Sequence, residues 1–536
     1  MRLALMVFVC SLGYSQDLLQ PGKSASGEIP ARGKRRLSVQ CFGGDYFGAA
    51  ITRQGPVDVA ILGPDEILVR RFPGVDGSRR ISFAADGGGS YTIELTNSSE
   101  SPAKFEITLD ARLPFAERLT PPPPADTPVI EALRKQILAD PAGATEQFWM
   151  DIGRRGSPIV EPAGTDGKYH LVTFLFRGGS FTRNVVVLGP DWGPIGYANN
   201  TMTRIGNTDV WYFTKRLPSG ARFDYRLSIN DPLTSDFKAS AIRRSTMQSD
   251  PLNPRRTGCT AGAPRNECLS VVELPGAVPQ PWLIKRPGTP SGKIEHHTIH
   301  SAIQGLDREI DVYTPPGYRR DGTANHLVVL FDGPEYLSEY SLPTTMDNLL
   351  ASQKIPSTVA VLVSDVGDRR LTDLVANPEF SDFIAKELVP WVRARYSVTV
   401  DADRVVVGGY SAGGLAAVYT GFRHSEVFGN VMSQSGALWW APDHYQGRDS
   451  TTEANWMAKQ FVVSPKLPLR FHLVAGTFEA DRGSRGGDIL EASRHLRDVL
   501  LAKGYVVHYQ QFVGGHDGLS WPGTLADGLM ALLGPR

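Results

Sequence analysis

At 536 residues the chain is too long for one hydrophobic core, and two to four domains are expected. Its content of 41% hydrophobic and 21% charged residues is typical of a folded protein and argues against a disordered chain. The formal net charge is zero, which argues against a general affinity for nucleic acid or anionic membranes.

Residues 1–15 have the composition of a secretory signal peptide. Arg2 supplies a positive charge, residues 3–12 are nearly all apolar, and Gly13 and Ser15 are the small residues expected before a cleavage site. No later apolar run reaches the roughly 18 residues that a membrane span needs. We therefore expect a periplasmic or secreted protein without a membrane span.

Residues 17–112 are predicted to form a β-sandwich, because short alternating runs such as 57–61 and 91–95 recur between turn residues. The run Gly-Gly-Ser-Tyr-Thr-Ile at 88–93 and the final strand, 104–109, resemble the pre-peptidase C-terminal β-domains of secreted hydrolases. That resemblance implies an accessory role in binding or spacing.

Residues 113–147 are predicted to be a proline-rich linker followed by a helix, since four prolines stand at 121–124 and helical periodicity follows. Residues 148–290 are again rich in strand patterns and predict a second β-sandwich. Cys259 and Cys268 flank a short loop in it, and export favours a disulfide between them.

Residues 291–536 alternate between apolar strand runs and amphipathic helices, with helices predicted over 380–396, 412–424 and 488–503. This alternation predicts a mostly parallel sheet with helices on both faces, as in an α/β-hydrolase domain. The predicted architecture is therefore multidomain, with two N-terminal β-sandwich domains followed by an α/β-hydrolase domain.

The stretch Gly409-Tyr-Ser-Ala-Gly413 lies between a predicted strand and a predicted helix. This is the G-x-S-x-G pattern in the context that a nucleophile elbow requires. Glycines at −2 and +2 remove Cβ atoms that would clash in a sharp turn, and the helix start directs free N–H groups at an oxyanion. We interpret Ser411 as a nucleophile.

A serine nucleophile needs a base and an orienting acid. His516 lies in Gly-Gly-His-Asp-Gly, after the last strand, in the chain order Ser, acid, His of α/β-hydrolases. The acid should follow the preceding strand, where Glu479 and Asp481 both qualify. We favour Glu479, with Asp481 as the alternative.

The backbone N–H groups of Ala412 and Gly333 are the predicted oxyanion donors; Pro334, next to Gly333, has no N–H. His296, His297 and His300 lie on one alternating stretch without carboxylate or cysteine spacing that suits zinc, so no metal site is predicted. No cofactor is predicted either.

The region from about 148 to 536 resembles enterochelin (enterobactin) esterase and its periplasmic relatives among the esterase D-like α/β-hydrolases. The matching pieces occur in the family's order, and they include Phe-Asp-Gly at 331–333, Arg-Leu-Thr-Asp-Leu at 370–374, Ser-Gln-Ser-Gly-Ala-Leu-Trp-Trp at 433–440 and Gly-Gly-His-Asp-Gly-Leu-Ser-Trp at 514–521. The resemblance carries the nucleophile to Ser411, the base to His516 and the acid to Glu479.

The same resemblance implies further substrate contacts. Arg370 matches a family arginine that lines the substrate cleft, with a structural salt bridge to a nearby acid as the alternative. The implied aromatic walls near the mouth of the cleft are Trp439, Trp440 and Trp521, with core packing as the alternative. Asp373 stands where the family pattern has a glutamate, and the first β-domain is an addition to the family layout.

The function that the resemblance implies is a secreted serine esterase that cuts the ester bonds of an iron-loaded catecholate trilactone through an acyl-enzyme. A carbohydrate esterase of the feruloyl or acetyl-xylan type, with a glycan-binding β-domain, is the alternative. A non-catalytic binding protein is a third reading, against which the contexts of Ser411 and His516 argue. The expected partner is a small-molecule ester; the sequence does not define the oligomeric state.

Overall fold

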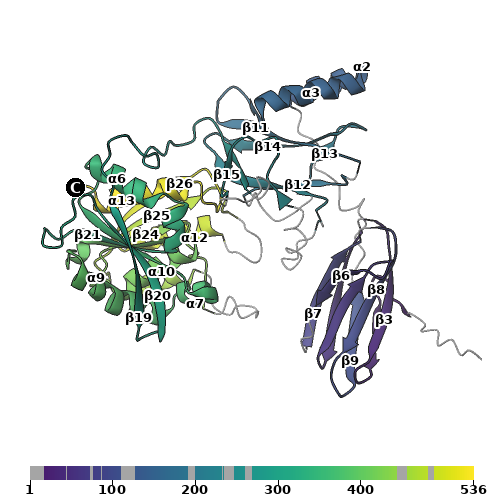
Figure 1. The fold of residues 1–536 in the computed structure, drawn as a ribbon, viewed down its shortest axis with the longest axis horizontal. Helices are drawn as coiled ribbons and strands as arrows, with labels where there is room; N and C mark the ends of the chain where they lie inside the picture. The colour runs from purple at the N-terminus through teal and green to yellow at the C-terminus, as the bar shows by residue number, and fades with distance from the viewer. Residues whose placement is uncertain are drawn as a thin grey trace, which may run out of the picture.

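The computed structural model describes residues 17–43, 45–72, 77–85, 87–109, 127–180, 182–190, 200–231, 233, 247–259, 268–442, 455–480 and 488–535. Figure 1 shows two β-rich bodies from the N-terminal half of the chain and an α/β body from the C-terminal half. Within the described ranges, no helix is both long and apolar enough to cross a membrane.

The first β-body is a two-sheet sandwich. One sheet has the strand order β1-β3-β8-β5-β6 and the other β2-β9-β4-β7. Strand β9 shows why it forms, because buried Ala103, Phe105, Ile107 and Leu109 alternate with less buried residues and enter the core between the sheets. The strands are β1 (Asp17–Leu18), β2 (Ser24–Ile29), β3 (Lys34–Cys41), β4 (Tyr46–Gln54), β5 (Val57–Leu62), β6 (Leu68–Phe72), β7 (Gly77–Ala84), β8 (Gly89–Asn97) and β9 (Ala103–Leu109).

The second β-body also has two sheets, with the orders β10-β11-β14-β13 and β12-β15-β18-β17, and β16 pairs with β15. The Cys259–Cys268 disulfide is present, and it joins the segments after β17 and before β18. The strands are β10 (Ile159–Pro162), β11 (Tyr169–Arg177), β12 (Val185–Leu188), β13 (Thr203–Arg204), β14 (Val210–Pro218), β15 (Arg222–Ile229), β16 (Met247–Gln248), β17 (Arg256–Thr257) and β18 (Leu269–Glu273).

Two helices precede this sandwich and pack on it. Helix α2 (Pro128–Ala139) begins after Thr127, whose hydroxyl accepts a hydrogen bond from the N–H of Ile130, and α3 (Pro141–Arg155) follows directly. Their apolar side chains form one cluster with strands β11 and β14; it contains Ile130, Leu133, Phe148, Trp149, Ile152, Leu175, Val210 and Tyr212. The helix that the sequence assigns to the 113–147 linker is therefore a layer of the second domain, whereas prolines 121–124 lie outside the described residues.

The C-terminal body is built on an eight-stranded sheet with the order β19-β20-β22-β21-β23-β24-β25-β26. The pairs β19–β20 and β20–β22 are antiparallel, and the remaining neighbours are parallel. The strands are β19 (Lys293–Ser301), β20 (Leu306–Thr314), β21 (His326–Phe331), β22 (Thr358–Val363), β23 (Val405–Tyr410), β24 (Asn430–Gln434), β25 (Arg470–Gly476) and β26 (Val506–Phe512).

Helices cover both faces of this sheet, which is why β22, β23 and β24 are buried along their whole length. One core cluster includes residues of η5 and α8 to α12, and the other includes residues of α5, α6 and α13. The elements are α5 (Gly333–Ser338), α6 (Leu342–Ala351), η4 (Gly367–Arg369), α7 (Arg370–Leu374), α8 (Pro378–Asp382), η5 (Phe383–Leu388), α9 (Val389–Arg395), η6 (Ala402–Arg404), α10 (Ala412–Arg423), α11 (Trp456–Val463), α12 (Ile489–Ala502) and α13 (Trp521–Leu533).

The helix predicted over 380–396 is interrupted. Between α8 and α9 the chain makes the wider π-helical turn η5, immediately before Pro390. Proline has no N–H, and its ring would clash with the carbonyl of residue 386 in a continuous α-helix, so a change of helical register accommodates it.

The packing of α2 on the sandwich predicts a measurable stability effect. Leu133→Ala should lower the free energy of unfolding by about 2–4 kcal/mol, because it leaves a cavity in a core that includes Trp149 and Leu175. Denaturant unfolding measures it, with Leu138→Ala as the control, since Leu138 lies in the same helix with 87% of its surface exposed. Equal stability of the two variants would mean that α2 is a detached linker helix.

Candidate active site

The turn from β23 into α10 holds Ser411 in an unusual backbone conformation, with φ of 54° and ψ of −121°. Two hydrogen bonds fix it, from the N–H of Ser411 to the carbonyl of Gln434 (2.9 Å) and from the N–H of Ala437 to the carbonyl of Ser411 (2.9 Å). A Cβ atom on Gly409 would lie 2.6 Å from the carbonyl carbon of Gly413. Only glycine therefore permits this close turn, as a nucleophile elbow requires.

Ser411, His516 and Glu479 form one hydrogen-bonded chain. His516 Nε2 lies 2.9 Å from Ser411 Oγ, and His516 Nδ1 lies 2.6 Å from Glu479 Oε1. Glu479 is fully buried, and its other oxygen, Oε2, accepts a hydrogen bond from the N–H of Gly476 (2.6 Å). A serine, an imidazole and a carboxylate in this order can move a proton from the hydroxyl to the imidazole.

The acid is therefore in contact with the predicted base. Glu479 follows β25 by three residues, and His516 lies in the loop between β26 and α13. Asp481, the alternative acid, lies outside the described residues. The catalytic roles of all four residues remain predictions that substitution can test.

Both predicted oxyanion donors are the first residues of helices that start at the carboxyl ends of parallel strands. Ala412 is the first residue of α10, and Gly333 is the first residue of α5, directly after β21, which pairs with β23. A Cβ on Gly333 would lie 2.8 Å from the carbonyl carbon of Leu362, so the backbone packs closely there too. Their role as donors stays a prediction.

Arg370 is paired with a buried carboxylate, and its predicted role as a substrate contact stays a prediction. Its Nε and Nη2 atoms donate to Oδ1 and Oδ2 of the fully buried Asp332, at 2.5 and 2.9 Å. Asp365 also lies 3.5 Å from its Nε. Burial, reinforced by the charge of Asp332, raises the pKa of Asp365 to about 7.

Asp332 is a residue whose importance the sequence does not reveal. It lies between β21 and α5 in the left-handed region, with φ of 57°, and a Cβ on Gly413 would lie 2.8 Å from its Oδ2. The Asp332–Arg370 pair thus connects the elbow, the start of α5 and the start of α7. In the sequence, the only signal for this pair is an aspartate directly before Gly333 and an arginine after the next strand.

Asp373, the departure from the family pattern, has a structural partner. Its Oδ2 accepts a hydrogen bond from Arg308 Nη2 at 2.6 Å, and both side chains are 1% exposed. Arg369 Nη2 donates to its other oxygen at 3.2 Å. This buried pair fixes α7, and so the segment that carries Arg370, against β20.

The three tryptophans differ in position. Trp440 and Trp521 are 6% and 4% exposed, so they pack in the core and do not form the open aromatic walls that the resemblance implies. Trp521 stacks on Tyr410 at 4.4 Å and lies edge-on to the His516 ring at 5.0 Å, which makes it a support for the base. Trp439 is half-buried, and its role at the cleft stays a prediction.

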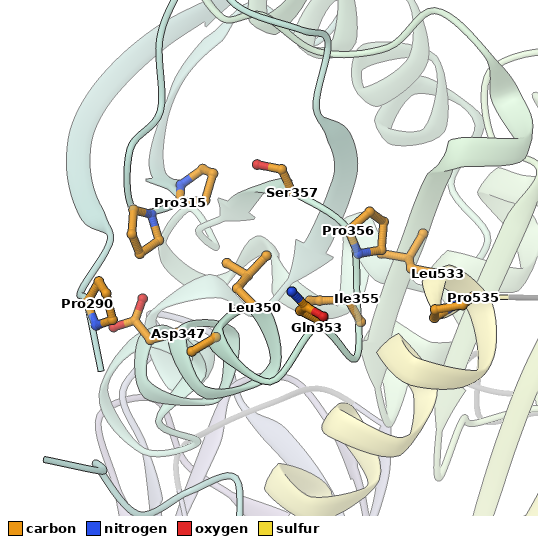
Figure 2. A pocket seen from close by; sticks show the side chains of 12 residues that line it. Pro290, Pro315, Asp347, Leu350, Gln353, Ile355, Pro356, Ser357, Leu533 and Pro535 are labelled. Carbon is orange, nitrogen blue, oxygen red and sulfur yellow. The ribbon is translucent and has the colours of Figure 1, made fainter. Parts of the chain in front are cut away.

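A separate cavity of about 570 Å³ lies away from these residues (Figure 2). Its wall includes Ser357, directly before β22, and Leu533, at the end of α13. Ser411 instead follows the end of β23, which runs parallel to β22 and β21. The cavity therefore lies near the amino end of β22, whereas Ser411 lies at the carboxyl end of the parallel strands. It is not the active site.

Comparison with known proteins places the chain in a family. Residues 301–532 match the esterase family, and residues 171–283 match the N-terminal domain of enterochelin esterase. The chain is 30% identical over 351 residues to an iron(III) enterobactin esterase of Escherichia coli, which covers 62% of this chain and 82% of that protein. The chain belongs to the enterochelin esterase family. It is therefore an ester hydrolase of the serine hydrolase type.

Other relatives and solved structures agree. An iron(III) enterobactin esterase of Dickeya dadantii is 27% identical, over 74% of this chain and 95% of that protein. The ferric enterobactin esterase of Salmonella typhimurium superposes with a TM-score of 0.59 and 27% identity, covering 72% of this chain and 98% of that one. The two family matches fall on the second β-body and the α/β body, in the N-terminal and C-terminal order of the family.

The geometry around Glu479 predicts the effect of an isosteric change. In Glu479→Gln the amide oxygen must face the N–H of Gly476, so the NH₂ group faces His516 Nδ1. That arrangement favours the tautomer protonated at Nε2, which cannot accept the proton of Ser411. We expect kcat on an aryl ester to fall by roughly 10²- to 10⁴-fold. Asp481→Asn, the matched comparison, should change kcat far less, and the reverse ranking would assign the acid to Asp481.

Two further carboxyls, one in the loop of the predicted base and one in the second sandwich, lie close enough to interact with each other. Asp517 follows His516, and Asp224 belongs to β15 of the second sandwich. Burial raises the pKa of Asp224 to about 6, against the opposing effect of Arg226. Burial, followed by the charge of Asp224, raises the pKa of Asp517 well above its ordinary value. Both carboxyls ionise near pH 4 in an unfolded chain.

A carboxyl whose pKa is raised by folding stabilises the protein below its unfolded pKa and loses that contribution as the pH rises through its folded pKa. The free energy of unfolding should therefore fall between about pH 4 and 6 because of Asp224. Asp224→Asn should raise the Tm at pH 7, by the equivalent of about 1–2 kcal/mol, and leave it unchanged below pH 4. Thermal unfolding across this range tests it, with the exposed Asp166→Asn as control. A lower Tm for Asp224→Asn at pH 7 would contradict the expectation.

Proposed function

We propose that this enzyme hydrolyses the ester bonds of a catecholate siderophore of the enterobactin type, through an acyl-enzyme on Ser411. The observation that carries the proposal is the Ser411–His516–Glu479 hydrogen-bond chain in a protein whose relatives are iron(III) enterobactin and salmochelin esterases. A trilactone of this type presents carbonyl carbons that a serine can attack and alkoxide leaving groups that need a proton.

Each residue of the site has its own part in the proposed reaction. His516 Nε2 accepts the proton of Ser411 as Oγ bonds to the carbonyl carbon, and Glu479 stabilises the imidazolium. The N–H groups of Ala412 and Gly333 hydrogen-bond the resulting oxyanion. His516 then protonates the departing alkoxide as the ester C–O bond breaks. Water, deprotonated by the same imidazole, releases the acyl group from Ser411.

The cellular site of this reaction is part of the proposal. The apolar run at residues 3–12, after Arg2, supports export to the periplasm or the exterior. A catecholate siderophore would meet the enzyme there either before or after it binds iron.

The charges of the described residues affect whether the site favours an anionic, iron-loaded substrate or a neutral ester. A ferric tris-catecholate is a trianion, while the guanidinium of Arg370 is neutralised by Asp332. Arg482 and Arg485, which follow Glu479 in the sequence, lie outside the described residues. We expect Arg370→Ala to reduce turnover of neutral and anionic esters alike, because it leaves the buried Asp332 unpaired.

A hydrolysis panel tests the proposed substrate. Ferric enterobactin, the iron-free trilactone, a feruloyl sugar ester and an acetyl sugar ester are compared by kcat/KM, with the released acids separated by chromatography. We expect a trilactone to lead the panel and Ser411→Ala to lower its kcat by on the order of 10⁴ or more. Ser411 should also be the residue that a fluorophosphonate labels. Faster cleavage of a sugar ester would replace the siderophore by a glycan substrate without changing the mechanism.

A further inference from the structure

The second β-sandwich makes direct backbone contacts with the loop that carries the predicted base. The N–H of Arg222, at the start of β15, donates to the carbonyl of Val513 at 2.9 Å. A Cβ on Gly514 would lie 2.7 Å from the carbonyl oxygen of Arg222, and a Cβ on Gly515 would lie 2.3 Å from Cβ of Pro190. Three consecutive residues before His516 therefore abut the sandwich.

The two glycines of this loop are required by that approach and not by their backbone angles. Neither Gly514 nor Gly515 has a positive φ, so other residues could adopt their conformations. The first atoms that a Cβ at 514 or 515 would meet belong to the sandwich, at Arg222 and Pro190, and at 514 the ring of Phe512 follows at 3.1 Å. The absence of Cβ atoms thus lets the sandwich lie directly on the histidine loop.

The loop that carries the predicted acid is held by the same strand. The ring of Phe478, next to Glu479, lies edge-on to the ring of Phe223 in β15, with centroids 6.1 Å apart. Phe478 and Val513 both pack against the core cluster of the sandwich. The N–H of Phe478 also donates to the carbonyl of Gly514 at 3.0 Å, which ties the two loops together.

We propose that the second sandwich is a positioning element of the active site, in which Phe223 and the Arg222 backbone hold the loops of His516 and Glu479 at hydrogen-bonding distance. This inference rests on the catalytic roles proposed for Ser411, His516 and Glu479. The sandwich residues touch no reacting atom. Their contacts fall one to three residues before the base and one residue before the acid, so a shift at the interface is passed directly to both side chains.

The energetic reason is that proton transfer tolerates little displacement. A shift of about 1 Å in a catalytic group can cost on the order of 10²-fold in rate. The loops hold short separations, 2.9 Å from His516 Nε2 to Ser411 Oγ and 2.6 Å from His516 Nδ1 to Glu479 Oε1. A rigid β-sheet core behind both loops is a suitable support for such a geometry.

A clash-and-relief experiment on the full-length enzyme tests the proposal. Gly515→Ala places a methyl group against Pro190, and Pro190→Gly removes the atom that it meets. On p-nitrophenyl acetate we expect Gly515→Ala to lower kcat by about 10- to 100-fold with KM within about threefold. The double variant Gly515→Ala/Pro190→Gly should return kcat to within about threefold of the Pro190→Gly single variant. Rates of Ser411 labelling by a fluorophosphonate should follow kcat.

Two further variants keep the test decisive if Gly515→Ala does not fold. Phe223→Leu keeps an apolar side chain in the sandwich core and removes the ring that faces Phe478, so we expect kcat to fall by about 5- to 20-fold. Leu227→Ala, in the same strand and the same core, is the control, and it should lower the Tm while leaving kcat within about twofold of wild type.

The outcomes separate this inference from the proposed function. Loss of kcat in Gly515→Ala and Phe223→Leu, with recovery in the double variant, supports positioning by the sandwich. Wild-type kcat in folded Gly515→Ala, no recovery in the double variant, or equal kcat in Phe223→Leu and Leu227→Ala overturns it. A wild-type enzyme that is not labelled at Ser411, or that retains kcat as Ser411→Ala, instead refutes the catalytic assignment itself.

Discussion

The fully buried carboxylate of Glu479 is the constraint on which the rest of the site depends. A carboxylate that is shielded from water needs hydrogen-bond partners within the protein. Here the partners are the N–H of Gly476 and the imidazole of His516. The first partner turns the chain back on itself immediately after β25. The second draws the loop after β26 across the end of the sheet. Once both bonds are made, Nε2 of His516 has one direction left to point, and Ser411 lies there at 2.9 Å.

A second constraint is the close approach of backbones around Ser411. The elbow needs glycine at 409 because Gly413 lies against it, and glycine at 414 because Ser433 Oγ would lie 2.7 Å from a Cβ there. The neighbouring pair Asp332–Arg370 is bidentate and its carboxylate is buried, so it ties the residue before α5 to the first residue of α7. Catalytic geometry here is a result of close packing between rigid elements, with little left to flexible side chains.

Local patterns in the sequence single out Ser411 and His516 as candidates because their surroundings are themselves local: a strand, a glycine turn and a helix. The sequence favoured Glu479 over Asp481 without deciding between them, since both follow the same strand. The contact of the buried Glu479 with His516 depends on tertiary packing, which no local pattern shows. The pairing of Arg370 with Asp332 joins residues 38 positions apart and leaves no periodic signal. For Trp440 and Trp521, residue type alone did not distinguish an exposed wall from a buried support. The helix near 130 was recognised, but its docking onto the second sandwich depends on contacts with β11 and β14 that periodicity cannot show.

The reason for glycine at positions 514 and 515 can be seen only in the fold. In the sequence they are turn residues before a histidine, and a turn would need at least one positive φ to require glycine. Neither has one, and the nearest atoms that a Cβ at these positions would meet belong to the second sandwich. A glycine pair that lies within the hydrolase domain is thus explained by contact with the neighbouring domain. Under the positioning role that we propose for the sandwich, the two domains matched by the enterochelin esterase family act as one catalytic unit. On that view, separating them should release the loops of His516 and Glu479 even though Ser411 and its elbow would be unaltered.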